Sequence, residues 1–221
     1  MSELAEYINE HFGGTLKFGS HEPNGEACAL EALSQFKGLN WSDQPNYMRC
    51  FDFRPLNDAA WSSDAKRTAA IVPLMEALDG SLDWPHHQRQ AFVQLLAIET
   101  VRRIIADLPI FLVVERERCR RAETLSAAAD AAEAARRVAA ATDNPAYYAD
   151  NPAYFAAHAA YYAAQTAQDV RSDFTRSVAA ASADAANCTA RADTYHDKVL
   201  ERTCAIWIQA AKDSRDPKLI S

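Results

Sequence analysis

Three residue types that cooperate in nucleophilic or metal chemistry lie close together near the start of the chain. The segment "GSHEPNGEACALEAL" places His21, Cys28 and Glu31 within eleven residues. A histidine can take the proton of a thiol while a carboxylate orients the ring, so this set could activate a thiolate. His21 and Cys28 could instead bind a metal ion, with Asp43 as a further ligand. The structural alternative makes Cys28 a small core residue and leaves His21 bonded to a backbone carbonyl.

The segment around Cys28 has the composition of a short helix. If that helix starts near Gly25, Cys28 and Glu31 lie three residues apart on one face. His21 would precede it on a glycine-rich loop that could fold back toward the thiol. Gly38 is expected to end the helix.

The second candidate site is an aromatic ladder, "DNPAYYADNPAYFAAHAAYYA", which runs from Asp143 to Ala163. An asparagine followed by proline is typical of a helix start, because the side-chain oxygen caps a free N–H and proline has none to leave unpaired. The two Asn-Pro pairs therefore predict a break near Asn144 and a new start or kink near Asn151.

Past Pro152 the ladder repeats every seven residues, which is nearly two helical turns. Two aromatic rows then run side by side with a histidine between them. The stripe could fill gaps between close alanine helices in a bundle, bind a partner protein, or form the seam of a homodimer. The predicted contact side chains are Tyr147, Tyr154, Phe155, His158, Tyr161 and Tyr162.

One basic cluster stands out, the run "RERCRR" from Arg116 to Arg121, with Arg102 and Arg103 a few turns earlier. Glutamates alternate with these arginines, which favours a solvated helix face carrying ion pairs three and four residues apart. Contact with an acidic partner or a nucleic acid is the alternative. The chain contains no phosphate-binding glycine loop and no GxSxG or HExxH motif.

Composition limits the class of protein. With 221 residues, 49% of them hydrophobic, the chain can form one domain or two small ones with a real core. A net charge of −7 argues against general nucleic-acid binding and leaves another protein as the expected partner. Five widely spaced cysteines without a CxxC pair predict reduced thiols in the cytoplasm. We expect no signal peptide, no membrane contact and no cofactor.

The elements that must position these residues are helices, because no segment alternates apolar and polar residues with the period of a strand. We expect an all-α fold in one compact unit, with short helices and loops over residues 1–82 and long alanine-rich helices over 83–221. Pro73 should kink or shorten one helix. A break is expected near Leu108, followed by one helix from about Ile110 through the alanine-rich stretch, and the last helix should end near Asp213.

The N-terminal motif resembles a family of uncharacterised proteins from phages and bacteria, especially actinobacteria and their phages. The similarity covers roughly residues 17–142 and includes "LND", "AIVPLMEALDGS" and "AIETVRRIIADLPIFL". Where the family often carries two cysteines, this chain has Tyr47 and Arg49, which weakens a metal site. The resemblance implies a phage or mobile-element setting and transfers no activity. The matching motif residues are Gly19, Ser20, His21, Gly25, Cys28, Glu31, Ser42, Asp43 and Pro45.

Together these features predict a non-enzymatic helical protein that binds another macromolecule. The phage-like setting and the acidic balance suggest an inhibitor of a host or defence protein in the bacterial cytoplasm, for example an anti-CRISPR protein whose acidic face mimics DNA phosphate. Two alternatives remain open: an enzyme that uses His21 and Cys28 or a metal ion, and a self-associating structural bundle.

Overall fold

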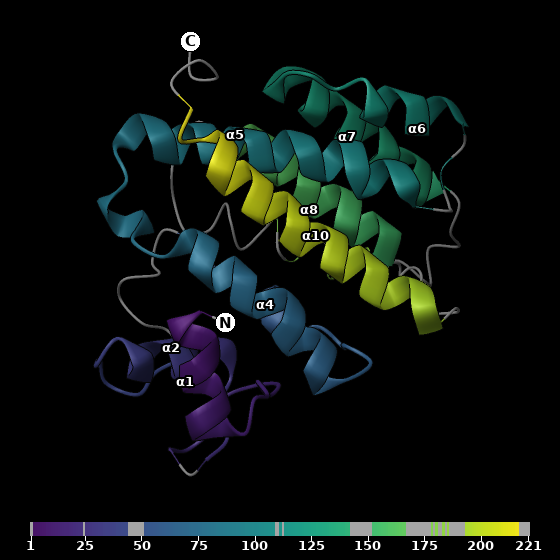
Figure 1. Ribbon diagram of the computed structural model, residues 1–221. Helices are drawn as coiled ribbons and strands as arrows, with labels where there is room; N and C mark the ends of the chain where they lie inside the picture. Colours follow the sequence, from purple (N-terminus) through teal and green to yellow (C-terminus); the bar gives the residue numbers. More distant parts are fainter. Residues whose placement is uncertain are drawn as a thin grey trace.

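The chain is built from helices joined by turns, in the part that the computed structural model describes (Figure 1). This confirms the all-α prediction. The structure describes residues 2–23, 25–43, 51–108, 111, 113–141, 152–166, 178, 180, 183, 185 and 193–216.

The first helices are short and have well-defined ends. Helix α1 (Glu3–Phe12) begins where the Ser2 hydroxyl accepts a hydrogen bond from the backbone N–H of Ala5, and it ends at Gly13. Gly13 adopts φ of 61°, a left-handed conformation that glycine reaches without a Cβ clash, and the helix therefore ends there. Helix α2 (Ala29–Phe36) follows, and then the single turn α3 (Arg54–Asn57).

Helix α4 (Asp64–Leu78) tolerates a proline in its interior. Pro73 has no N–H to donate to the carbonyl four residues earlier, yet the helix continues to Leu78 and is not shortened. The helix buries apolar side chains on both sides of Pro73, and this tertiary packing offsets the lost backbone bond. Those side chains are Ile71, Val72, Leu74, Met75 and Leu78.

Helix α5 (His86–Arg103) carries a broad apolar stripe into the core. Pro85 caps its first turn in an extended conformation, and Asp83 closes the short 3-10 turn η2 (Ser81–Asp83) just before it. A second turn, η3 (Ile105–Asp107), follows α5. Leu108 is then extended, at φ −64° and ψ 129°, which confirms the predicted break ahead of Pro109.

The single helix expected after that break is two helices, α6 (Val113–Arg120) and α7 (Leu125–Ala141). The expectation was wrong because the sequence between them carries its own start signal. The Thr124 hydroxyl accepts a hydrogen bond from the N–H of Ala127 at 3.2 Å, as a capping residue does.

Helices α8 (Pro152–Thr166) and α10 (Asp193–Asp213) complete the fold. The helix start at Pro152 and the end at Asp213 agree with the sequence, whereas the break expected near Asn144 lies outside the described residues. Helices α7 and α8 pack closely because alanines line the contact. The buried alanines are Ala128, Ala131, Ala132, Ala135 and Ala139 on α7, and Ala156, Ala157, Ala160, Ala163 and Ala164 on α8.

Helix α10 brings the C-terminal part of the chain into contact with earlier helices. It packs against α4 and α5, and Figure 1 shows it in yellow between them. Its Trp207 meets Phe92 of α5 with ring centroids 5.9 Å apart, and Phe51 stacks edge-on against the same Phe92 at 4.8 Å. One hydrophobic cluster therefore contains residues from both of the stretches, 1–82 and 83–221, that the sequence distinguishes.

Candidate functional site

The structure brings His21, Cys28 and Glu31 together, but as a helix cap. The Glu31 carboxylate accepts hydrogen bonds from the backbone N–H of Cys28 at 2.8 Å and of His21 at 2.6 Å, and its Oε2 lies 3.0 Å from His21 Nδ1. Helix α2 therefore begins at Ala29, not near Gly25 as expected. Glu31 is its third residue and reaches back to the N-terminal cap, which is the geometry of a capping box.

The environment of Cys28 opposes thiol chemistry. Burial raises the pKa of this thiol to about 12, so the thiolate that a nucleophile or metal ligand requires is scarce at neutral pH. Asp43 does not join the cluster in a metal site, and no three His, Cys, Asp or Glu side chains among the described residues are placed to hold a metal ion. Asp43 instead adds, after Asp52, to the negative charge that raises the pKa of Arg54.

The aromatic ladder is described at two of its six side chains. Tyr161 is half-buried and packs against the hydrophobic core. His158 is half-buried too, and desolvation together with Arg136 of α7 lowers the pKa of its ring. Both side chains thus lie on the packed side of α8. Tyr147 and the side chains of Tyr154, Phe155 and Tyr162 lie outside the described residues.

The basic residues form the ion pairs that the sequence predicts. On α5, Arg102 and Arg103 each lie 2.6 Å from Glu99, and after α6 Arg121 lies 3.8 Å from Glu117, which also pairs with Arg120 at 3.0 Å. These partners are three or four residues apart, so the prediction of a solvated, paired helix face is confirmed for them.

Tertiary structure adds contacts that the sequence does not show. Asp107 of η3 pairs with Arg120 of α6 at 3.2 Å and with Arg202 of α10. Arg202 also donates to the backbone carbonyl of Arg103 at 3.2 Å. The ends of α5, α6 and η3 are thereby tied to the middle of α10. We call this surface the arginine corner, and it consists of Arg102, Arg103, Arg120, Arg121, Lys198 and Arg202.

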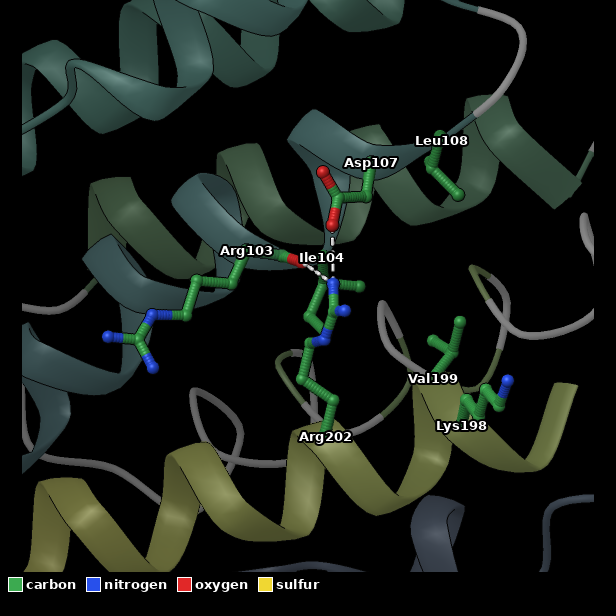
Figure 2. A pocket seen from close by; sticks show the side chains of 7 residues that line it. All are labelled: Arg103, Ile104, Asp107, Leu108, Lys198, Val199 and Arg202. Atoms are coloured by element: carbon green, nitrogen blue, oxygen red, sulfur yellow. Dashed lines mark hydrogen bonds and ion pairs between the residues drawn. The ribbon is translucent and has the colours of Figure 1, made fainter. Parts of the chain in front are cut away.

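A small pocket of about 40 Å³ opens at the arginine corner, between η3 and α10 (Figure 2). The Arg202 side chain reaches from α10 to Asp107, while the Arg103 guanidinium points away from that pair. Lys198 lies one turn before Arg202. The remaining wall is aliphatic and comes from Ile104, Leu108 and Val199.

The arginine corner holds more cations than paired carboxylates, although the whole chain carries a net charge of −7. Six cationic side chains gather there, and within the described residues their ion pairs are made with three carboxylates, Glu99, Asp107 and Glu117. Lys198 has no ion-pair or hydrogen-bond partner within the described part of the chain. Because these cations are exposed or half-exposed, an anion can reach them, so the corner can bind an acidic ligand.

A buried carboxylate ties α10 to α4 on another side of the helix. Asp197 accepts hydrogen bonds from the backbone N–H of Ser62 at 3.0 Å, from the Ser62 hydroxyl, and from Lys66 at 2.6 Å. Burial by itself would raise the pKa of Asp197, but these bonds outweigh it and hold the pKa at about 2. A carboxylate that is so weak a base cannot activate Ser62, so this network is an anchor between the two helices.

Comparisons with protein-family models, with curated proteins and with solved structures find no match to this chain. Among the helices that the structure describes, none has the length and the apolar character that crossing a membrane requires.

Proposed function

We propose that this protein is a non-enzymatic binding module that recognises an acidic surface of another protein through the arginine corner. The observation that supports the proposal is the excess of cations there, six against three paired carboxylates, on a chain whose overall charge is negative. Charge of one sign confined to one surface orients an oppositely charged partner and speeds its association.

Several features favour a protein over a nucleic acid as the partner. The net charge of −7 repels a polyanion over most of the molecule. Val113 and Val114 are exposed at the start of α6, about 10 Å along that helix from Arg120. Exposed aliphatic side chains near arginines are typical of protein interfaces, where arginine is enriched and apolar area fills the centre.

The resemblance to phage and actinobacterial proteins extends the proposal. In that setting the partner is a host protein in the bacterial cytoplasm, and its capture inhibits it, as an anti-CRISPR protein inhibits a defence complex. Buried Cys28, with its pKa near 12, supports the non-enzymatic proposal over the alternative that uses a Cys28 thiolate.

Affinity capture from bacterial lysate tests the proposal. The bait is the full chain, as wild type and as the double variant Arg103→Glu/Arg121→Glu, whose side chains are 58% and 82% exposed and can change without disturbing the core. Lys212→Glu is the control, because it also replaces an exposed cation by a carboxylate but lies on the last turn of α10. We expect wild type and control to capture the same protein, the double variant to lose it, and added salt to release it.

Equal capture by the double variant would contradict the proposed surface. In that case the same experiment with Tyr161→Ala, checked for helicity by circular dichroism, asks whether the aromatic ladder makes the contact. Light scattering on the pure protein over a range of concentrations tests the remaining alternative, a self-associating bundle.

A further inference from the structure

We infer that the pocket between η3 and α10 recognises one acidic side chain of the partner together with an aliphatic neighbour of that side chain. The inference rests on the proposed function and deepens it, because it names the chemistry that the arginine corner selects. It is argued from the charges at the rim of the pocket, the aliphatic wall and the volume.

Two cationic side chains from the same face of α10 lie at the rim of the pocket. Among the described residues, one of them has an ion-pair partner and the other has none. Lys198 and Arg202 are four residues apart on α10, which separates their backbones by about 6 Å along the axis. Arg202 is held by Asp107 and by the carbonyl of Arg103. Lys198 lines the same pocket and has no counter-charge among the described residues. An incoming carboxylate therefore pairs with Lys198 and gains attraction from the fixed guanidinium of Arg202.

The wall selects what accompanies the carboxylate. Ile104, Leu108 and Val199 are the apolar lining. Ile104 and Leu108 are buried, whereas Val199 is half-buried, so an aliphatic group that contacts Val199 removes apolar area from water. An inorganic anion or a phosphodiester gains nothing from this wall. In a peptide with a leucine or valine beside an aspartate or glutamate, the aliphatic side chain contacts the wall while the carboxylate pairs with the cations.

The volume limits the ligand further. A water molecule occupies about 30 Å³ in the liquid, so a pocket of about 40 Å³ accepts a methyl or isopropyl end but no aromatic ring or nucleobase. The pocket thus fits the aliphatic end of a short acidic peptide segment and is too small to enclose a ring.

Asp107 fixes the position of the bound cation at the rim. Its carboxylate is paired with Arg120 and Arg202, which holds Arg202 against the wall before any ligand arrives. Charge alone attracts phosphate as well as a carboxylate, so the selectivity for a peptide comes from the aliphatic wall.

Titration of the labelled full-length protein with small probes, followed by amide NMR shifts, tests the inference. The probes are acetyl-Leu-Glu-amide, its neutral match acetyl-Leu-Gln-amide, acetyl-Gly-Glu-amide, which lacks the aliphatic group, and inorganic phosphate. We expect acetyl-Leu-Glu-amide to bind with a dissociation constant on the order of millimolar and to shift the amides of Ile104, Leu108 and Val199. The other three probes should bind about fivefold more weakly.

Two variants separate charge from shape. Lys198→Gln removes the free cation, and Val199→Met fills the pocket without changing any charge. Each variant should bind acetyl-Leu-Glu-amide about fivefold more weakly than wild type does. Lys212→Gln, on the same helix but far from the pocket, should bind like wild type. The dispersion of the amide spectrum shows directly that each variant is folded.

Three results would overturn the inference: equal binding of the Glu and Gln peptides, phosphate binding as strong as that of acetyl-Leu-Glu-amide, or unchanged binding by Val199→Met. The inference about the pocket can also fail while the proposed function stands. If lysate capture survives in Val199→Met and Lys198→Gln but is lost in Arg103→Glu/Arg121→Glu, the arginine corner binds the partner and the pocket does not.

Discussion

Replacing the buried Asp197 by asparagine should destabilise the protein in a pH-dependent way. Asp197 is 2% exposed and its charge is held by Lys66 and by two donors of Ser62. These bonds lower its pKa from 3.8 to about 2. At about 1.4 kcal/mol for each pH unit, that depression corresponds to about 2 kcal/mol of folding free energy at neutral pH. Asp197→Asn should lose about this amount, because an amide keeps the shape but not the charge.

The direction of the pH dependence follows from the lowered pKa. A carboxylate whose pKa is lower in the folded state binds its proton more readily in the unfolded state. Its contribution is therefore complete above pH 3.8 and disappears as the pH falls through about 2. The stability difference between wild type and Asp197→Asn should be constant from pH 7 to about pH 5 and should shrink toward pH 2.

Urea denaturation followed by circular dichroism, at pH 7, 4 and 2.5, measures this difference. Asp213→Asn is the matched control, since Asp213 lies on the same helix and bonds Gln209 at the surface, 2.7 Å away. In the Asp197→Asn background, Lys66→Ala should have little further effect, because the pair is already lost. A stability difference that stays the same from pH 7 to pH 2.5 would refute the reasoning, since the loss would then come from packing and not from charge.

Further predictions concern the helix cap, the alanine contact and the thiols. Glu31→Gln should cost about 1–3 kcal/mol in urea denaturation, because one amide oxygen cannot replace two carboxylate oxygens that accept buried donors; an unchanged midpoint would dismiss the capping role. Ala160→Leu should lower the thermal midpoint by overpacking the α7–α8 contact at a cost of about 1–3 kcal/mol, whereas the exposed Ala141→Leu should not. Cys28 should resist iodoacetamide at pH 8 in the folded protein, read by peptide mass spectrometry; labelling at the rate of a free thiol would revive the enzyme alternative.

Local signals in the sequence predicted local structure correctly. Pro152 begins α8, and Glu117 pairs with Arg120 and Arg121, because each of these outcomes depends on residues within one turn. In the same way, the absence of strand-like alternation was enough for the fold class.

Contacts between distant segments were not predictable from such signals. Arg202 meets Asp107 95 residues away, and nothing near either residue indicates the other. Lys198 and Arg202 were not predicted as site residues either, because a spacing of four residues on a helix does not indicate what the helix packs against. The capping role of Glu31 was missed because its partner at the cap is Cys28, outside the serine, threonine, aspartate and asparagine set that marks most helix starts.

The late position of α10 in the chain also determines when the protein can fold during its synthesis. In the folded protein Trp207 of α10 covers part of Phe92, and Asp197 of α10 accepts hydrogen bonds from Ser62 and Lys66. These contacts cannot form before α10 has been synthesised. At about 5–20 residues per second, the ribosome needs roughly 5–20 s to advance from the end of α5 to the end of α10. Throughout that interval the apolar faces of α4 and α5 lack their final cover. The nascent chain therefore has a window of several seconds in which these apolar faces are accessible to other molecules, before α10 covers them.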